Sequence, residues 1–482
     1  MNYKMTAYVL GKMLGVEALV LCIPAAVSLI YGETSDMAAF GITSVVLCIF
    51  FLLFGRKKPE NGRIYGKDGL VIVAAAWILW SVFGALPFYL SREIPSYVDA
   101  LFETVSGFTT TGSTILTDIE ALSYGMNFWR CLTHWIGGMG VLVFVMVVTS
   151  LDDKSSMHLM RAEVPGPEAD KLVPKARETA KLLYAMYLAL TVAEIIFLLA
   201  GGMNLYDSII HSFSTAGTGG FANHNSSVAY YDSAYIDGVI TVFMILFGIN
   251  FNMYFLLLIK DVKSVWKNEE VRAYLGIIVA ATSVITCNVL SIYKEPLKAF
   301  RYSIFQVASI ITTTGFATAD FNLWPELSKC ILLLIMVIGA CAGSTGGGVK
   351  VSRFLILWKS ILKQVKGMLH PKLVNVVKVN GKKISNETLQ GVYAYFSAYV
   401  FVFGISVLLV ALDNFDFATT ISGVLTTLSN VGPGISRVGP IENFQSFSVL
   451  SKIVFSMDML IGRLEIFPFL MICSPSFWRK HF

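Results

Sequence analysis

Charged residues are scarce in this sequence. Asp, Glu, Lys and Arg make up 14% of its 482 residues, and hydrophobic residues make up 55%. Soluble globular chains carry about 25% charged residues, because each domain must present a polar surface to water. The composition therefore excludes two or three soluble domains of ordinary size.

Cysteine is sparse as well, with seven residues and no Cys-x-x-Cys pair. The sequence thus offers neither a disulfide framework nor a cysteine metal site. It also lacks a set of nucleophile and base residues, so an enzyme is not expected. No soluble basic domain is present to bind nucleic acid. We expect no cofactor in this chain.

Long apolar runs take the place of soluble domains. Runs of about 20 residues, the length that crosses a bilayer, recur along the whole chain. We expect an all-α polytopic membrane protein with ten transmembrane helices. Most of the 37 Lys and Arg residues fall on one side of them, which predicts a lipid-embedded, multi-pass inner-membrane protein with both termini cytoplasmic. The expected spans are 7–30, 37–54, 69–90, 127–150, 181–200, 235–259, 273–292, 329–349, 391–412 and 446–473.

Four of the loops on the opposite side contain a short apolar segment that ends in Thr, Ser, Asn or Gly residues. Each segment closes on a glycine, and such repetition is typical of a multiplied unit. We expect a pseudo-fourfold repeat of outer helix, re-entrant pore loop and inner helix, like that of a potassium channel. The segments are 97–112, 205–220, 300–315 and 417–432. The predicted division is 1–60 (two extra N-terminal helices), 61–165, 166–268, 269–370 (with an intramembrane gating loop) and 371–482.

The ends of these segments suit a dehydrated monovalent cation. Rings of backbone carbonyl oxygens replace the hydration shell in potassium filters, and glycine permits the dihedral angles that point them inward. The C-terminal end of each re-entrant helix favours a cation. No Asp or Glu ring is present, which argues against a divalent channel. A single such stretch would also fit a helix cap, but four copies favour a filter. The predicted filter residues are Thr110, Thr111, Gly112, Thr218, Gly219, Gly220, Thr313, Thr314, Gly315, Asn430, Val431 and Gly432.

With these motifs the chain resembles the Trk/Ktr/HKT potassium transporter superfamily, and within it the bacterial TrkH-type membrane subunits. The resemblance covers essentially the entire chain. Further matching segments are 134–140, 214–221, 250–252, 342–350, 429–434 and 462–465.

The resemblance implies uptake of K⁺, with glycine at all four filter positions favouring potassium over sodium. The second and fourth stretches depart from Thr-Thr-Thr-Gly, so we expect a less regular and less selective filter. The resemblance also implies a homodimer. A cytoplasmic ring of TrkA-type nucleotide-binding subunits would dock on the basic inner loops, and ATP or NAD would bind that partner.

A glycine-rich stretch lies inside the eighth expected span. A phosphate-binding loop does not fit, because the lysine is displaced from the last glycine and no strand precedes the stretch. Tight helix packing on small residues is the simple alternative. We expect a flexible intramembrane loop that gates the pore, as the resemblance also implies. Its residues are Gly343, Ser344, Thr345, Gly346, Gly347, Gly348 and Lys350.

Arg463 is the second predicted gating residue. An arginine in the middle of a span is costly and usually faces the bundle interior. We expect its charge to project toward the pore and oppose cations. The alternative is an ion pair with Glu465 or Asp458. Asn250 and Asn252 are expected on an inner helix, where they would line the cavity, unless each forms a helix-to-helix hydrogen bond.

Two transport mechanisms stay open. A channel-like pathway would use the membrane potential, which is worth about 2.3 kcal/mol per charge at 100 mV. A proton- or sodium-coupled symporter is the alternative, although the sequence displays no obvious carboxylate relay. The related potassium-binding subunit of a P-type pump is disfavoured, because the motifs fit the Trk branch.

Overall fold

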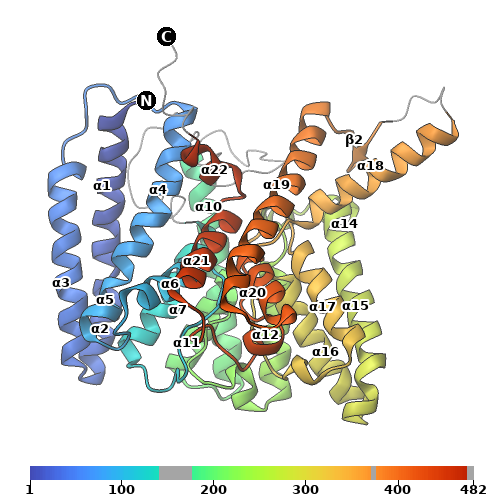
Figure 1. Cartoon of the computed structure of the whole chain (residues 1–482), viewed down its shortest axis with the longest axis horizontal. Helices are drawn as coiled ribbons and strands as arrows, with labels where there is room; N and C mark the ends of the chain where they lie inside the picture. The colour runs from blue at the N-terminus through green and yellow to red at the C-terminus, as the bar shows by residue number, and fades with distance from the viewer. Residues whose placement is uncertain (141–175, 371–375, 475–482) are drawn as a thin grey trace.

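Helices dominate the structure, a computed structural model that describes residues 1–140, 176–370 and 376–474 (Figure 1). Within these residues the only sheet is an antiparallel hairpin of β1 (Lys378–Val379) and β2 (Lys382–Lys383). Short 3₁₀ turns cover Ser227–Tyr231, Phe321–Leu323, Ala411–Asp413 and Ser436–Val438.

The N-terminal part forms a separate pair of long helices at the left of Figure 1. The first is α1 (Tyr3–Val20) continued by α2 (Cys22–Tyr31), and the second is α3 (Thr34–Phe50) continued by a π-helical turn, η1 (Phe51–Gly55). A Cβ atom built on Gly11 would lie 2.6 Å from the Gly55 nitrogen. Glycine therefore allows the two helices to touch through their backbones, which agrees with an extra hairpin in residues 1–60.

The rest of the described chain repeats one order of helices four times, in which a long helix is followed by a short helix and then by a further helix, which is broken in the last three repeats. The first repeat is α4 (Gly66–Gly84) with α5 (Leu86–Ser91), α6 (Tyr97–Phe108) and α7 (Tyr124–Met139). The second is α10 (Ala176–Ala200), α11 (Leu205–Gly217) and α12 (Ala234–Phe247) with α13 (Phe251–Leu258). The third, after α14 (Val262–Lys267), is α15 (Glu269–Tyr293), α16 (Pro296–Ile311) and α17 (Glu326–Ile338) with α18 (Val351–Leu369). The fourth is α19 (Asn386–Val410), α20 (Phe417–Ser429) and α21 (Val449–Arg463) with α22 (Phe467–Cys473).

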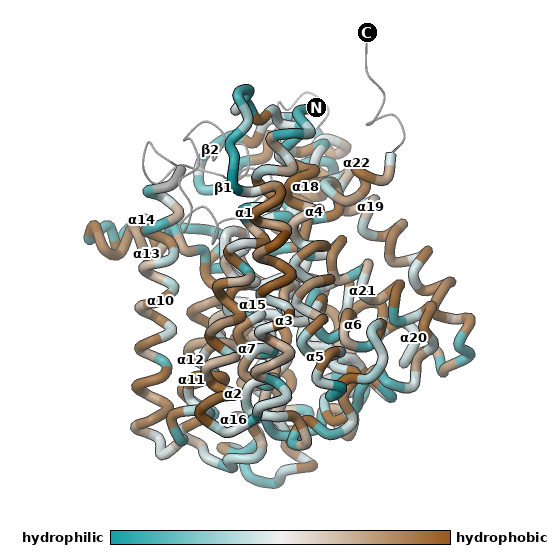
Figure 2. The backbone as a smooth tube through the Cα atoms, turned by 90° about the vertical axis from the view of Figure 1, so that its left-hand side faces the viewer, coloured by the Kyte–Doolittle hydropathy of each residue, from teal (hydrophilic) through white to brown (hydrophobic). Residues whose placement is uncertain are grey.

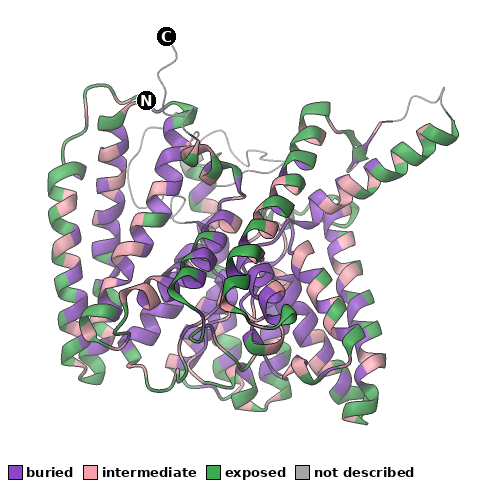
Figure 3. Ribbon diagram, in the orientation of Figure 1, coloured by how far each residue is buried: buried purple, intermediate pink, exposed green. Residues whose placement is uncertain are grey.

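Burial separates the short helices from the long ones (Figure 3). The short helices α6, α11, α16 and α20 are mostly buried, whereas the outer faces of the long helices are exposed and apolar. On α19, for example, Phe401 is 74% exposed. A wide exposed apolar belt of this kind is stable against lipid and unfavourable in water.

Within the described residues, six helical segments are long and apolar enough to cross a membrane, or seven if the bent pair α12–α13 is one span. The expected spans 127–150, 235–259, 329–349 and 446–473 are not continuous helices. Residues 141–150 of the first lie outside the described residues, α12 and α13 meet at 92°, and the other two break after Ile338 and after Arg463. The count of ten spans therefore stays a prediction. The repeat boundaries also stay predictions, and those at 165/166 and 370/371 fall on or beside residues outside the described part.

The breaks have local causes. Gly140 and Gly339 adopt positive φ angles of 90° and 72°, which a helix cannot contain. Ile466, a β-branched residue, has a φ of 68°, so the break after α21 is strained and depends on surrounding contacts. The helix that follows the short helix is thus interrupted in the second, third and fourth repeats, and in the first repeat α7 ends at Met139, beside residues outside the described part.

Candidate functional site

The four short helices end in the same way. At or just after the C-cap of each helix, one residue has a left-handed φ of 54–61°. The N–H group of this residue donates a hydrogen bond to a carbonyl oxygen in the last turn of the helix. In the first repeat, Thr110 donates to Gly107 oxygen (3.1 Å) and Thr111 to Ser106 oxygen (2.9 Å). These bonds satisfy carbonyl groups at a helix end, as in a Schellman cap. The equivalent left-handed residues are Thr110, Thr218, Thr313 and Asn430.

Two residues later each segment reaches its glycine, with a φ between 80° and 100°. The intervening residue is not left-handed, so left-handed residues alternate with a residue of ordinary φ along each segment. Such alternation turns successive carbonyl groups toward one side of the chain, as a carbonyl-lined ion pathway requires. Only glycine adopts the last of these conformations without strain.

The four segments close into a ring, called the glycine ring below: residues 110–112, 218–220, 313–315 and 430–432. Each glycine faces the carbonyl oxygen of the middle residue in the neighbouring segment, so closely that a side chain has no room. The distance from a Cβ atom built on the glycine to that oxygen shows how close the segments are. It would be 1.9 Å from Gly112 to Gly219 oxygen, 2.0 Å from Gly220 to Thr314 oxygen, 2.2 Å from Gly315 to Val431 oxygen, and 2.9 Å from Gly432 to Thr111 oxygen. All twelve predicted filter residues therefore lie around one axis.

The ring is not fourfold in its side chains. The hydroxyl groups of Thr109 and Thr111 lie 2.8 Å apart, and Thr312 and Thr314 repeat this contact in the third segment. In the fourth segment the Asn430 amide instead donates to the Thr111 hydroxyl (2.9 Å). The second and fourth segments lack the paired threonines, which makes the ring irregular as their sequences predict.

His134, which we did not select as a functional residue from the sequence, packs behind the second segment. It is fully buried on α7, its Nδ1 lies 2.7 Å from Gly107 oxygen, and its ring stacks on Phe221 with centroids 4.1 Å apart. A Cβ atom on Gly219 would lie 2.3 Å from the imidazole. The ring thus fills the space that the missing side chain of Gly219 leaves. The motif around His134 was visible in the sequence, but this contact joins residues 85 positions apart.

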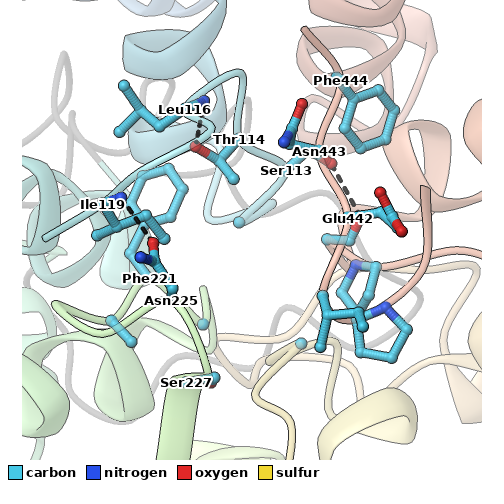
Figure 4. A pocket seen from close by; sticks show the side chains of 18 of the residues that line it. Ser113, Thr114, Leu116, Ile119, Phe221, Asn225, Ser227, Glu442, Asn443 and Phe444 are labelled. Carbon is cyan, nitrogen blue, oxygen red and sulfur yellow. Dashed lines mark hydrogen bonds between the residues drawn. The ribbon is translucent and has the colours of Figure 1, made fainter. Parts of the chain in front are cut away.

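One side of the glycine ring opens into a cavity of about 100 Å³, with the four glycines among its lining residues (Figure 4). Arg130, also in its lining, binds Glu103 of α6 (Nε–Oε1 2.5 Å) and donates to Ala222 oxygen (3.0 Å). This buried, paired arginine joins the first short helix to the chain after the second segment. The carboxyl group of Glu442 adds an exposed negative charge at the cavity.

The other side of the ring is covered by the glycine loop, defined here as Gly339–Lys350. Gly347 N–H donates to the Thr313 hydroxyl (2.6 Å), and a Cβ on Gly347 would lie 2.6 Å from Ser429 oxygen. A Cβ on Gly346 would lie 2.9 Å from Thr312 oxygen. The loop therefore lies directly against the ends of the third and fourth short helices, and its glycines are what allow this approach.

The glycine loop is tied to three other elements. Cys341 N–H donates to Gly248 oxygen (3.1 Å) and Phe251 N–H to Gly343 oxygen (3.0 Å), which joins the loop to the α12–α13 bend. Glu270 of α15 accepts from Ala342 N–H (2.7 Å) and Ser352 N–H (3.1 Å). Glu270 was not predicted, because nothing in its own sequence neighbourhood links it to the loop. The predicted residues Ser344, Thr345 and Lys350 bond to the carbonyl groups of Cys341, Phe247 and Gly346.

Arg463 joins the glycine loop to α7. Its guanidinium donates to Thr345 oxygen (2.9 Å) and to the oxygens of Gly137 (2.5 Å) and Gly138 (2.8 Å). The two carboxylates proposed as alternative partners have other contacts: Glu465 binds Arg353, and Asp458 accepts from the Ser406 hydroxyl (2.7 Å). Arg463 thus lies beside the loop, and its charged guanidinium group is hydrogen-bonded to backbone carbonyl oxygens.

The prediction for Asn250 requires a correction. Asn250 does not lie on an inner helix but at the bend before α13, where its Oδ1 accepts from Asn252 N–H (2.9 Å). Its amide also faces Gly343, where a Cβ would lie 3.0 Å from Oδ1. The side chain is a helix cap beside the glycine loop, because the chain must turn there. Asn252 lies in the first turn of α13.

Comparison with known proteins identifies the family of this chain. The model of the TrkH family, described as cation transport protein, matches residues 39–480. The chain belongs to the TrkH family. It is therefore a cation transport protein and not an enzyme.

Relatives within the TrkH family match over the full length. The Trk system potassium uptake protein TrkH of Escherichia coli K12 is 36% identical, with 100% of both chains covered. The Trk system potassium uptake protein TrkG of the same strain is 32% identical, with 99% of both covered. The crystal structure of the potassium transporter TrkH from Vibrio parahaemolyticus matches with a TM-score of 0.89 and 33% identity, over 99% of this chain and 100% of that one.

Proposed function

We propose that this protein carries K⁺ into the cell through the glycine ring, which acts as its selectivity filter. The observation that carries the proposal is the closed ring of four segments, each with a left-handed residue followed two positions later by a left-handed glycine. Carbonyl oxygens on several sides can replace the water around a monovalent cation. The relatives named as potassium uptake proteins support the choice of ion.

The glycine loop acts as the gate in this proposal. It lies against the ring on the side opposite the cavity, so the described conformation corresponds to a closed pathway. Arg463 and Lys350 place positive charge there, and two like charges 4 Å apart repel by about 4 kcal/mol at an effective dielectric constant near 20. Opening then requires the loop and the Arg463 side chain to move aside.

The same proposal gives the orientation and the partners. The N-terminus and α22 lie at the same end of the molecule, at the top of Figure 1, while the short helices lie in the lower half. The excess of Lys and Arg in the loops at that upper end supports a cytoplasmic location for it. A homodimer in the inner membrane, regulated by a TrkA-type subunit that binds ATP or NAD, follows from the family resemblance alone.

Proton- or sodium-coupled symport is the second candidate, and one buried carboxyl group favours it. Asp458 on α21 is 1% exposed, and its Oδ2 has no hydrogen-bond partner among the described residues. A carboxyl group inside the membrane region is costly and often marks a proton or ion pathway. Asp458 is therefore the residue to test if transport depends on a second ion.

Uptake by potassium-transport-deficient cells that express this chain tests the proposal. We expect uptake of K⁺ and Rb⁺ in preference to Na⁺; equal uptake of Na⁺ would contradict the filter assignment. In vesicles at zero membrane potential, an imposed proton or sodium gradient separates the two mechanisms. K⁺ accumulation driven by that gradient, and lost in Asp458→Asn, would establish symport.

A further inference from the structure

A basic and aromatic corner lies outside the transport pathway, where the chain leaves α12. The helices α12 and α13 meet at 92°, so α13 runs across the direction of α12 rather than continuing it. Figure 2 shows α13 and α14 in the upper half of the molecule, toward the end that carries the N-terminus, and α14 lies beside the start of α15. Apolar side chains on this segment are exposed, including Leu258 at 65%, Ile259 and Val262.

The short helix α14 separates apolar from basic side chains. Val262 and Trp266 lie four residues apart on one face, and Lys263 and Lys267 lie four apart on the adjacent face. Trp266 is 68% exposed. An exposed tryptophan next to lysines is typical of the boundary between the acyl chains and the headgroups of a bilayer.

The β1–β2 hairpin brings further lysines to this corner. Glu269 N–H, at the start of α15, donates to Asn380 Oδ1 at the hairpin tip (2.8 Å). Lys359 of α18 binds Glu269 and donates to Lys378 oxygen (2.8 Å). The lysines in or beside the corner are Lys260, Lys263, Lys267, Lys359, Lys378, Lys382 and Lys383.

The acidic side chains at the corner are each bonded to a neighbouring group of the protein. Glu269 binds Lys359, and Asp261 accepts from the Ser264 hydroxyl (2.6 Å) and the Ser264 N–H (3.2 Å) at the start of α14. Glu270 points to the glycine loop. The exposed surface therefore keeps an excess of positive charge around an apolar and aromatic edge.

We propose that this corner, residues 257–267 with the β1–β2 hairpin, binds the headgroups of anionic phospholipids. The exposed apolar residues of α13 would enter the acyl region, Trp266 the interface and the lysines the phosphate layer. A soluble acidic protein would match the lysines but leave Leu258 and Ile259 without apolar contacts. The combination of both surfaces on one segment favours lipid.

Binding of lipid at the corner acts on the glycine loop, and this step rests on the proposed function. The α12–α13 bend holds the loop through Gly248 and Phe251, and α13 begins at Phe251. Lipid that fixes α13 in the plane of the membrane therefore stabilises the bend and the closed loop. Basal K⁺ flux should be lower in vesicles that contain anionic lipid than in neutral vesicles.

The test uses the full chain reconstituted in vesicles with dibrominated phosphatidylglycerol or dibrominated phosphatidylcholine at equal fractions. Bromine quenches nearby tryptophan, and the difference between the wild-type protein and Trp266→Phe isolates Trp266. We expect stronger quenching by the anionic lipid. Lys263→Gln/Lys267→Gln should weaken that preference roughly tenfold or more, since each lysine near an anionic surface contributes about fivefold.

The control Arg56→Gln/Lys57→Gln removes the same charge from the exposed loop after η1 and should leave the quenching of Trp266 unchanged. High salt should reduce the preference in the wild-type protein without any substitution. Equal quenching by both lipids, or none by either, would overturn the lipid site. A lipid preference without any change in basal flux would overturn its coupling to the loop. Absence of K⁺ flux in every vesicle would count against the proposed function and not against lipid binding.

Discussion

The Arg463 guanidinium donates a hydrogen bond to the carbonyl oxygen of Thr345 (2.9 Å). The bond joins the last repeat to the glycine loop of the third, 118 residues earlier in the chain. Because the same side chain also reaches Gly137 and Gly138 of α7, it links three repeats beneath the glycine ring. In the proposed gate, one arginine in a broken span therefore both holds the loop and repels cations.

Replacing Arg463 should open the pathway. Arg463→Ala removes the contacts with three carbonyl groups, each worth about 1.5–3 kcal/mol when the donor is charged, and the local positive charge. We expect basal K⁺ flux in reconstituted vesicles to rise about tenfold or more. Arg463→Lys keeps the charge but cannot make the forked contacts, so its flux should be intermediate. Flux in Arg463→Ala at or below the wild-type value would remove Arg463 from the gate.

Glu270 should hold the glycine loop closed from the side of α15. Its Oε1 accepts from the N–H groups of Ala342 and Ser352, so Glu270→Ala leaves two donors without this acceptor, at a cost of about 1–3 kcal/mol each. We expect higher basal K⁺ flux and faster labelling of a cysteine introduced at Ser344.

The neighbouring Glu269→Ala is the matched control for Glu270→Ala. Glu269 lies one residue earlier on α15 and binds Lys359 of α18 rather than the loop, and its replacement removes the same charge. Its flux and labelling rate should stay near those of the wild-type protein. If both variants labelled equally fast, the anchoring role of Glu270 would be wrong.

The residues of the glycine ring could be predicted from the sequence because their pattern is local and occurs four times. Four segments of similar length close on Gly112, Gly220, Gly315 and Gly432, where a left-handed φ coincides with a carbonyl oxygen too close for a side chain, so glycine is required. The irregular fourth segment was also foreseen from Asn430 and Val431. Each segment alone is a weak pattern, but four copies together predict that the segments meet around one axis.

The contacts that hold the glycine loop could not be foreseen. Glu270 lies 72 residues before Ala342, and a glutamate at the start of a helix predicts a capping role rather than a distant acceptor. The breaks in the helices were missed for a related reason. The sequence stays apolar from α12 into α13, so hydropathy gives no sign of a break between residues 247 and 251. The chain nevertheless turns by 92° there, because tertiary contacts satisfy the backbone groups that the break leaves free.

Gly112→Ser should weaken discrimination between K⁺ and Na⁺. A Cβ at this position would lie 1.9 Å from Gly219 oxygen, and the φ of 81° is unfavourable for serine. The neighbouring segment must shift, which changes the spacing of the oxygens around the ion. We expect the ratio of K⁺ to Na⁺ uptake in transport-deficient cells to fall about tenfold, equivalent to about 1.4 kcal/mol.

Gly202→Ser separates this effect from backbone strain. Gly202 has a similar φ of 87°, but a Cβ there meets nothing within 4 Å. The variant should lose some stability and keep the ion preference of the wild-type protein. An unchanged ion preference in Gly112→Ser, with normal amounts of protein in the membrane, would contradict the filter assignment.

Glu93, in the link between α5 and α6, should make stability depend on pH. Burial and the nearby charge of Asp36 raise the pKa of Glu93 from an ordinary 4.5 to about 7. Between these values the folded protein keeps a proton that the unfolded chain releases, so the free energy of unfolding falls as pH rises from about 4.5 to about 7. The Glu93→Gln side chain does not titrate, so the stability of this variant has no such dependence on pH. We expect it to match the wild-type protein near pH 4.5 and to exceed its apparent Tm in detergent at pH 8.

The size of the Glu93 effect is limited by partial exposure to solvent, and about 2 kcal/mol is the expected upper range. Glu442→Gln is the control, since this exposed carboxyl group lies on the same side of the ring and should alter Tm little at either pH. The Ser123 N–H lies 3.3 Å from Glu93 Oε1 and remains bonded in Glu93→Gln, because the amide oxygen also accepts. A Tm difference between Glu93→Gln and wild type that stays constant from pH 4.5 to 8 would mean that folding does not raise the pKa of Glu93.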